Sequence, residues 1–325
     1  MKVDEKRGTL EQAVAEPGTA RSPASEPDVT DRPHRAGFVA IVGRANVGKS
    51  TLLNQVLGTR LAIVSRKPQT TRHRIVGIKS LPTAQLVFVD TPGLHRPVSL
   101  LAERMVEVAR KSLAEADVAL WLIDAGAGLT PADRELGAEL AGERRPLVVG
   151  LNKSDLTSKR ALLGLAAEVA DLLPGRDVVP VAATTGANIA ELLRTVEPLL
   201  PLSPPLYPAD LETDLPERFF AAEIIREQIF LTTHEEVPYQ SAVRIDAFTE
   251  RPERNLLVIR ATILVARPSQ RAILLGERGS HIKAIGQGAR LELERFFASR
   301  VFLETFVKVD ADWFANPRTL AELGL

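Results

Sequence analysis

Eight residues, Gly43-Arg44-Ala45-Asn46-Val47-Gly48-Lys49-Ser50, constrain the fold of this chain more than any other stretch. The apolar, β-branched run at 38–42 before them predicts a buried strand, and residues 51–57 after them predict a helix. Strand, Gly-x-x-x-x-Gly-Lys-Ser and helix are the context of a phosphate-binding loop. In such a loop, backbone N–H groups close around a β-phosphate and the helix N-terminus adds partial positive charge. We expect Lys49 to reach the β- and γ-phosphates and the Ser50 hydroxyl to coordinate Mg²⁺.

Composition limits the class of protein without identifying it. With 325 residues, the chain is long enough for two domains that each bury a core. Lys plus Arg and Asp plus Glu number 41 each, so overall charge argues neither for nor against nucleic acid. Cysteine is absent, which excludes disulfides, thiolate metal sites and a cysteine nucleophile. No apolar run reaches about 18 residues and the N-terminus has no apolar core, so we expect a cytoplasmic protein.

Changes in composition and periodicity divide the chain into five segments. Residues 1–36 are rich in Pro, Ala, Glu, Thr and Ser and predict a disordered N-terminal arm. Residues 37–198 alternate strand and helix patterns, which is typical of an α/β domain with a largely parallel sheet. Six prolines between 198 and 216 predict a stiff linker over 199–216. A second domain at 217–316 and a C-terminal tail at 317–325 complete the chain.

A second motif, Asn152-Lys153-Ser154-Asp155, follows the strand expected at 147–151 and indicates which base is bound. The Asp155 carboxylate can accept hydrogen bonds from guanine N1–H and from its 2-amino group. Adenine lacks that amino group and has an acceptor at N1, so it would leave the carboxylate unpaired. Sites built on such bonds reject the wrong partner by roughly 10⁴–10⁵. The motif is weak alone, but at the end of a strand after a phosphate loop it predicts GTP.

Asp90-Thr91-Pro92-Gly93 follows the strand expected at 86–89, as the aspartate of a nucleotide-binding site should. Asp90 can hold the hydration shell of Mg²⁺, and the Gly93 N–H can bond the γ-phosphate. The motifs at 43–50, 90–93 and 152–155 therefore all lie at the carboxyl ends of expected strands, where open α/β sheets bind ligands.

Two threonines in the polar segment 59–74, Thr70 and Thr71, can offer a hydroxyl to the same ion. We expect this segment to be ordered by the γ-phosphate and released on hydrolysis. The predicted metal ligands are therefore Ser50, Thr71 and Asp90. The alternative is that the two threonines are ordinary solvated loop residues.

The second domain predicts a different fold. Residues 218–230 have a helical period, 241–248 and 256–266 are expected strands, 270–275 and 280–298 are expected helices, and 301–309 is a last strand. This is an α-β-β-α-α-β unit with Gly276-Glu277-Arg278-Gly279 between its paired helices. A bare Gly-x-x-Gly is common, and one alternative is a helix-hairpin turn in a structural domain.

These motifs, in this order and at these spacings, resemble the Era family of bacterial GTPases. The resemblance covers about residues 37 to 314 and rests on Gly-Arg-x-Asn-Val-Gly-Lys-Ser, Ser-x-Lys-Pro-Gln-Thr-Thr-Arg-His-Arg, Asp-Thr-Pro-Gly-Leu and Asn-Lys-x-Asp. It implies a P-loop GTPase domain followed by a type II KH domain that binds the 3′ end of small-subunit ribosomal RNA during ribosome assembly. It also implies peripheral association with the inner face of the cell membrane.

The expected site residues follow from the motifs and from the resemblance. The nucleotide is expected at Gly43, Arg44, Ala45, Asn46, Val47, Gly48, Lys49, Ser50, Thr51, Asp90, Thr91, Pro92, Gly93, Leu94, Asn152, Lys153, Asp155, Ala182 and Ala183. The expected catalytic residues are Lys49, Gly93 and Thr71. RNA is expected at Gly276, Arg278, Gly279 and Lys283, because a Gly-x-x-Gly loop clamps about four nucleotides.

Four positions depart from the patterns of related GTPases. Ala45 stands where relatives often have Pro. Ala182 replaces a Ser, which leaves backbone N–H groups to meet guanine O6. Glu277 places a negative charge in the loop that should face phosphate. Leu94 stands where Ras-like enzymes have the Gln that orients the attacking water, so we assign no side-chain general base and expect slow turnover.

Two functional alternatives stay open at this point. The first is a GTP-driven factor that binds small-subunit ribosomal RNA, with Mg²⁺ as cofactor. The resemblance adds K⁺ near Asn46 as a candidate second ion, standing in for an arginine finger. The second alternative is a GTPase switch whose second domain docks a protein or the membrane surface.

Overall fold

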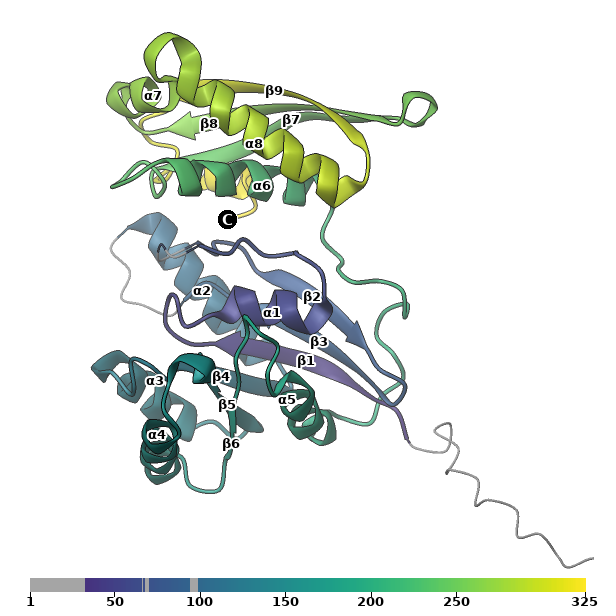
Figure 1. The fold of residues 1–325 in the computed structure, drawn as a ribbon, viewed down its shortest axis with the longest axis vertical. Coiled ribbons are helices and arrows are strands. Elements are labelled where there is room, and N and C mark those ends of the chain that lie inside the picture. Colours follow the sequence, from purple (N-terminus) through teal and green to yellow (C-terminus); the bar gives the residue numbers. More distant parts are fainter. Residues whose placement is uncertain (1–32, 66, 68–69, 94–98) are drawn as a thin grey trace, which may run out of the picture. The chain divides into compact units, whose positions relative to one another are not determined.

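A six-stranded sheet with helices on both faces forms the first part of the chain in the computed structural model, which describes residues 33–65, 67, 70–93 and 99–325 (Figure 1). The strands are β1 (Arg35–Val42), β2 (Ile75–Ser80), β3 (Ala84–Asp90), β4 (Val118–Asp124), β5 (Leu147–Asn152) and β6 (Asp177–Pro180). The helices are α1 (Lys49–Leu57), α2 (Leu100–Glu115), α3 (Pro131–Ala141), α4 (Lys159–Leu172) and α5 (Ile189–Val196).

The strand order is β2-β3-β1-β4-β5-β6, and the sheet is parallel except that β2 runs antiparallel to β3. The prediction of a largely parallel α/β sheet is confirmed. Alternate residues of β1 face opposite ways. Val39 and Ile41 pack in the core with α1 and α5, whereas Ala40 and Val42 pack in the core with α3 and α4. Because both faces are buried, the central strands are almost continuously apolar.

The first strand begins earlier than the sequence suggests. Of the predicted arm at 1–36, residues 1–32 lie outside the described residues. Arg35 and Ala36 nevertheless belong to β1, where they pair with residues 84 and 85 of β3. The end of the arm was placed too late because an Arg-Ala pair carries no strand signal of its own.

The proline-rich segment passes the amino-terminal ends of β1 and β3 and then reaches the edge strand β2. Leu202 forms an isolated bridge with Arg35, and the Gln85 side chain accepts hydrogen bonds from the backbone N–H groups of Leu206 and Tyr207, at 2.7 and 2.9 Å. Further on, Ile78 N–H donates to the Glu212 carbonyl oxygen. Backbone bonding therefore extends along the segment to residue 212.

The remaining described residues, 217–325, contain a three-stranded sheet packed against helices. Its elements are α6 (Glu217–Thr232), β7 (Ser241–Arg251), β8 (Leu256–Val265), α7 (Pro268–Leu275), α8 (Ser280–Phe297) and β9 (Arg300–Val309). Strand β8 pairs antiparallel with β7 and parallel with β9. The α-β-β-α-α-β order predicted from the sequence is confirmed. One core joins α6, α8 and the inward faces of the strands.

The predicted tail at 317–325 contains a short helix, α9 (Pro317–Glu322). Pro317 occupies its first turn and the Asn316 side chain caps it, which are ordinary helix-start signals. Leu320 is buried with Trp313. A helix of six residues is too short to show a helical period of apolar residues in the sequence, which therefore predicts only a tail at 317–325. No helix among the described residues is long and apolar enough to cross a membrane.

Candidate nucleotide site and RNA interface

The phosphate loop joins the carboxyl end of β1 to α1, as predicted. Lys49 is 7% exposed, and its Nζ donates to the carbonyl oxygens of Gly43 and Arg44 over 3.1 and 2.9 Å. Gly48 has a φ of +100°, and a Cβ there would lie 2.2 Å from Asn152 Nδ2. Only glycine fits that position, so the loop is held closely against the end of β5.

The three predicted metal ligands lie together at the end of β3. Ser50 Oγ donates to Asp90 Oδ2 over 2.6 Å and lies 2.8 Å from Thr71 Oγ1. Thr71 Oγ1 is 3.4 Å from Asp90 Oδ2. Because β2 is antiparallel to β3 and Ile75 pairs with Asp90, the residues before β2 reach this edge of the sheet. Thr70 does not join the group, since its hydroxyl donates to the Lys67 carbonyl oxygen.

The oxygen donors of this corner suit a magnesium ion. Asp90 is fully buried, and its Oδ1 has no hydrogen-bond partner among the described residues. Mg²⁺ is usually held by one or two carboxylates together with substrate phosphates and water. The described residues contain no group of three or more His, Cys, Asp or Glu side chains that could hold a metal. Hydroxyls and phosphate oxygens would therefore complete the coordination that Asp90 begins.

Burial changes the protonation of the two charged residues in this corner. It lowers the pKa of Lys49 from 10.5 to about 8, although the nearby Asp90 carboxylate acts in the opposite direction. Burial also raises the pKa of Asp90, opposed by Lys49 and by hydrogen bonds from Ser50, Thr71 and the Thr91 N–H. Each charge stabilises the other, so removing either one would leave a buried charge without compensation.

Asn152 bonds both the phosphate loop and the Ala182-Ala183 segment, which lie near the expected position of the base. Its Nδ2 donates to the Val47 carbonyl oxygen over 2.7 Å, and its Oδ1 accepts from the Ala183 N–H over 3.0 Å. Lys153 Nζ donates to the Asn46 carbonyl oxygen over 3.0 Å. Asp155 is exposed in a short 3-10 turn, Ser154–Leu156, directly after the strand. The structure thus brings the Asn-Lys-x-Asp motif to the phosphate loop.

The backbone of the Ala182-Ala183 segment is already hydrogen bonded within the protein. Ala182 N–H donates to the Ala187 carbonyl oxygen, and Ala183 N–H donates to Asn152. The sequence suggested that these N–H groups meet guanine O6. Each of them already donates a hydrogen bond within the protein, so a bond to O6 would have to share that N–H group with its present acceptor.

The other predicted residues have varied surroundings. Arg44 Nε pairs with Asp133 Oδ2 at 2.8 Å, so its side chain anchors the loop to α3. Gly93 lies against the phosphate loop, because a Cβ there would be 2.9 Å from Ala45 N. Thr91 is buried and donates to the Ile41 carbonyl oxygen. Pro92 is buried, Thr51 lies in α1, and Leu94 lies outside the described residues.

Two acidic residues support the site without belonging to any motif. Asp124 Oδ2 lies 2.5 Å from Lys153 Nζ, and fully buried Asp133 holds Arg44. Asp124 is the last residue of β4 and Asp90 is the last residue of β3, so both lie at the carboxyl ends of their strands. That position at a strand end is the sequence feature that could have identified Asp124 as a site residue. Asp133 carried no functional signal, because an Asp at the third position after Thr130 already serves as a helix cap.

A cleft of about 880 Å³ passes over these residues. It is lined from the first domain by Lys49, Ser50, Thr71, Gly93, Asn152 and Lys153, among others. Phe230, Leu231 and His234, at the end of α6 and just beyond it, also line the cleft. No sequence pattern predicts that residues of the second domain line this cleft.

The Gly-x-x-Gly loop lies between α7 and α8, as predicted. Arg278 and Lys283 are exposed, and so is Glu277. Arg278 has a φ of +50°, which is unusual for a residue with a side chain. His281 Nδ1, beside the loop, is 2.8 Å from the Ile273 carbonyl oxygen and ties α8 to α7. The loop therefore presents Glu277 and Arg278 to solvent, and Lys283 is exposed in the first turn of α8.

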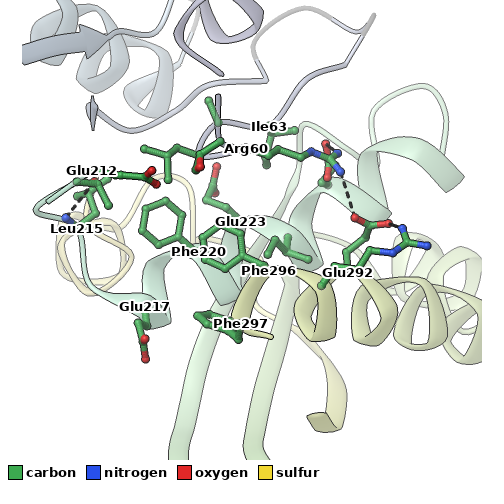
Figure 2. A pocket seen from close by; sticks show the side chains of 17 residues that line it. Arg60, Ile63, Glu212, Leu215, Glu217, Phe220, Glu223, Glu292, Phe296 and Phe297 are labelled. Carbon is green, nitrogen blue, oxygen red and sulfur yellow. Dashed lines mark hydrogen bonds and ion pairs between the residues drawn. The ribbon is translucent and has the colours of Figure 1, made fainter. Parts of the chain in front are cut away.

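A second cavity, of about 680 Å³, is lined by Arg60–Ile63 side chains, the end of the linker, α6 and α8 (Figure 2). Phe220, Phe296 and Phe297 line one side of it in Figure 2. Arg60 pairs with Glu227 at 2.6 Å and with Glu292 at 3.1 Å. The cavity contains none of the predicted nucleotide or RNA residues.

Two family models match the chain. Residues 38–153 match a "50S ribosome-binding GTPase" model, and residues 236–314 match a KH domain model. Among curated proteins, GTPase Era of Geobacter metallireducens is 48% identical over 296 residues, which cover 91% of this chain and 99% of the relative.

Two solved structures are similar over nearly the whole fold. A variant of Aquifex aeolicus Era bound to GDP·AlF4⁻ has a TM-score of 0.86 and 42% identity, covering 89% of this chain and 99% of that one. Era in complex with MgGDPNP and nucleotides 1506–1542 of 16S ribosomal RNA has the same TM-score and identity, with 90% and 99% coverage.

The fold and the nucleotide site define a P-loop GTPase that carries a C-terminal KH domain. Such an enzyme hydrolyses GTP to GDP and phosphate. The chain belongs to the Era family of GTPases.

Proposed function

We propose that this GTPase binds the 3′ end of small-subunit ribosomal RNA through its KH domain and assists assembly of the small ribosomal subunit. The observation that carries the proposal is that one chain holds both the Ser50, Thr71 and Asp90 corner and a Gly-x-x-Gly loop with exposed Arg278, followed by exposed Lys283 on α8. The Era structure with MgGDPNP and a 16S RNA fragment supports it, since this chain covers 99% of that protein.

In the proposed mechanism, the phosphate loop and Lys49 hold the β- and γ-phosphates, while Ser50, Asp90 and Thr71 hold Mg²⁺. The bound ion would neutralise charge that develops on the phosphate oxygens. Water attacks the γ-phosphorus, the bond from that phosphorus to the β–γ bridging oxygen breaks, and GDP and phosphate leave. Lys49 and the loop N–H groups stabilise the transferred charge. No side-chain general base is assigned, because residue 94 is a leucine.

RNA binding is tested by titrating the full chain, in its GDPNP–Mg²⁺ form, with RNA of nucleotides 1506–1542 of 16S ribosomal RNA. We expect binding that weakens with salt, because phosphate contacts release counterions with a log–log slope of about −0.7 per contact for single strands. An RNA of scrambled sequence is the control. Equal affinity for both RNAs would contradict recognition of this particular RNA, and binding to anionic vesicles but not to RNA would favour a domain that docks a membrane.

Two finer proposals rest on the family resemblance. K⁺ near Asn46 would add positive charge between the phosphates, and slower hydrolysis after replacing K⁺ with Na⁺ at constant ionic strength would support this role. Peripheral association with the cytoplasmic face of the membrane stays a prediction, which a vesicle sedimentation assay with the full chain can check.

A further inference from the structure

The residues on both sides of Thr71 are bonded to the second domain. Arg226, on α6, donates from Nη2 to the Thr70 carbonyl oxygen over 2.6 Å. Arg72 donates to the carbonyl oxygens of Ser241, Pro238 and Tyr239, at 2.7, 3.0 and 2.9 Å. The backbone that carries the Thr71 hydroxyl is therefore held from both sides by groups outside the first domain.

Arg226 is itself fixed in place. Its Nε and Nη2 bond the two carboxylate oxygens of Glu223, one turn earlier on α6, at 2.7 and 2.6 Å. Both side chains are almost fully buried, with 3% and 6% of their surface exposed. A bidentate pair of this kind has one geometry, and a charge-assisted bond to a backbone carbonyl is about twice as strong as a neutral one. Arg226 therefore presents a directed donor to the Thr70 carbonyl oxygen.

Lys67 adds a third attachment from the same segment. Its Nζ donates to the carbonyl oxygens of Phe230 and Thr233 at the carboxyl end of α6. A cation at this end of a helix satisfies carbonyl groups that lack helical partners. Bonds therefore run in both directions, from Lys67 to the carboxyl end of α6 and from Arg226 of α6 to Thr70.

We infer that Arg226, oriented by Glu223, is a positioning residue for GTP hydrolysis that acts from the KH domain by holding Thr71 at the magnesium corner. The inference rests on the proposed role of Thr71. It assigns Arg226 no contact with the nucleotide, and it predicts an effect on the chemical step rather than on binding. A misplacement of about 1 Å at a reacting group can cost roughly 10²-fold in rate.

The test measures steady-state GTP hydrolysis and its Mg²⁺ dependence for Arg226→Gln and Arg226→Lys in the full chain. We expect kcat to fall by about 10- to 100-fold in Arg226→Gln. KM should change less than about threefold, and half-maximal activity should need more Mg²⁺. Lys can still donate to the Thr70 carbonyl oxygen but cannot pair with Glu223 through two nitrogens, so Arg226→Lys should recover part of kcat.

Arg218→Gln is the matched control, because Arg218 is an exposed arginine on the same helix whose side chain donates to the Ile245 carbonyl oxygen. Its kcat should equal that of the parent. Since Arg226→Gln leaves Glu223 buried without its partner, the double variant Glu223→Leu/Arg226→Met replaces the pair by apolar residues of similar volume, which is often well tolerated. It should keep the parent's unfolding temperature and still lose kcat.

Thr71→Ala in the same assay distinguishes the proposed role of Thr71 from the role inferred for Arg226. If Thr71→Ala hydrolyses GTP like the parent, the proposed role of Thr71 is wrong and the inference falls with it. If Thr71→Ala is impaired while the folded Arg226 variants keep parental kcat and Mg²⁺ dependence, the role of Thr71 stands and only the inference about Arg226 is overturned.

Discussion

The side-chain amide of Asn152 links two segments of the predicted nucleotide site. Its amide bonds the phosphate loop on one side and the Ala183 backbone on the other. Gly48 allows this, because any Cβ at that position would overlap the Asn152 amide. One donor and one acceptor site of the Asn152 amide are therefore used within the protein, and we expect Asp155 to determine the choice of base.

Asp155→Asn should change which base is bound. The amide N–H₂ of the new Asn is a donor, and it would face the guanine N1–H and N2–H₂ groups, which are also donors. Xanthine has a carbonyl oxygen at position 2, which can accept a hydrogen bond from that N–H₂. We expect GTP affinity to fall by at least about 100-fold, and affinity for xanthosine triphosphate to rise. Competition binding with a fluorescent nucleotide measures both. Asp171→Asn, an exposed position on α4, is the control, and unchanged GTP affinity in Asp155→Asn would remove Asp155 from the site.

The lowered pKa of Lys49 predicts a pH dependence. Burial stabilises the neutral amine, which brings the pKa down to about 8 against the opposing effect of Asp90. Only the charged form attracts phosphate, and kcat/KM reports the ionisations of the free enzyme. We therefore expect kcat/KM for GTP to be level below about pH 7, to be halved near pH 8, and to fall about tenfold per pH unit above about pH 9. A rate profile that stays flat to pH 10 would contradict this reading of Lys49.

At the scale of elements, the loop before α8 shows that its two glycines are not equivalent. Gly276 has a φ of +67°, and a Cβ there would lie 2.7 Å from His281 Cβ. Gly279 also has a positive φ, of +78°, but nothing lies within 4 Å of a Cβ there. Asn and Asp tolerate such a backbone better than other residues do. Gly279 is therefore the position where charge can be added to the loop with the smallest cost to the fold.

Gly279→Asp should weaken RNA binding by about tenfold or more, because it places a negative charge beside phosphates. Gly279→Asn, of the same shape without the charge, is the control and should bind more tightly than Asp. Glu277→Lys should strengthen binding and steepen the salt slope by about 0.7. Filter binding at several salt concentrations measures all three, and RNA-free GTP hydrolysis should not change. Parental affinity in both charged variants would exclude this loop as the RNA contact.

Most elements were predictable from local patterns, whereas their mutual contacts were not. The buried strands were found because apolar runs end in motif residues, and α6 and α8 were found from their helical period. The first strand begins at Arg35, three residues before the expected run at 38–42, because Arg35-Ala36-Gly37 lacks the apolar pattern of the rest of the strand. The bonds of Arg72 and Arg226 join residues more than 150 positions apart, and no periodicity in one sequence encodes such pairs. The pairing of Asp133 with Arg44, 89 positions away, is not encoded in a local pattern for the same reason.

At the scale of the whole molecule, each domain has its own core. The core of the KH domain consists of residues between 221 and 309. The two cores of the first domain are built mostly from residues before 201, but Phe220 is buried in one of them, and Phe219, Phe296 and Phe297 pack against it. A smaller cluster does join the domains, since Leu101 and Met105 of α2 are buried with Trp313 and Leu320. We therefore expect the second domain to fold alone but to be less stable than in the full chain.

A fragment of residues 210–325 tests this division. It should show the circular dichroism of a folded α/β unit, bind RNA within about threefold of the full chain, and hydrolyse no GTP. The full chain carrying Lys49→Ala provides the matched comparison, because it removes hydrolysis while keeping every interdomain contact. An unfolded fragment would mean that the Leu101 and Trp313 cluster is required for the second domain to fold.

The bonded linker sets how far the second domain can move. Backbone bonds hold the linker to the sheet as far as Glu212, so only four residues, Thr213 to Pro216, remain before α6 begins. Fully extended, they span about 14 Å. If the Arg72 and Arg226 contacts break, this tether still keeps the released domain at a millimolar effective concentration around its docking surface. Return to the docked state is then an intramolecular event whose rate does not depend on how many copies of the protein a cell contains.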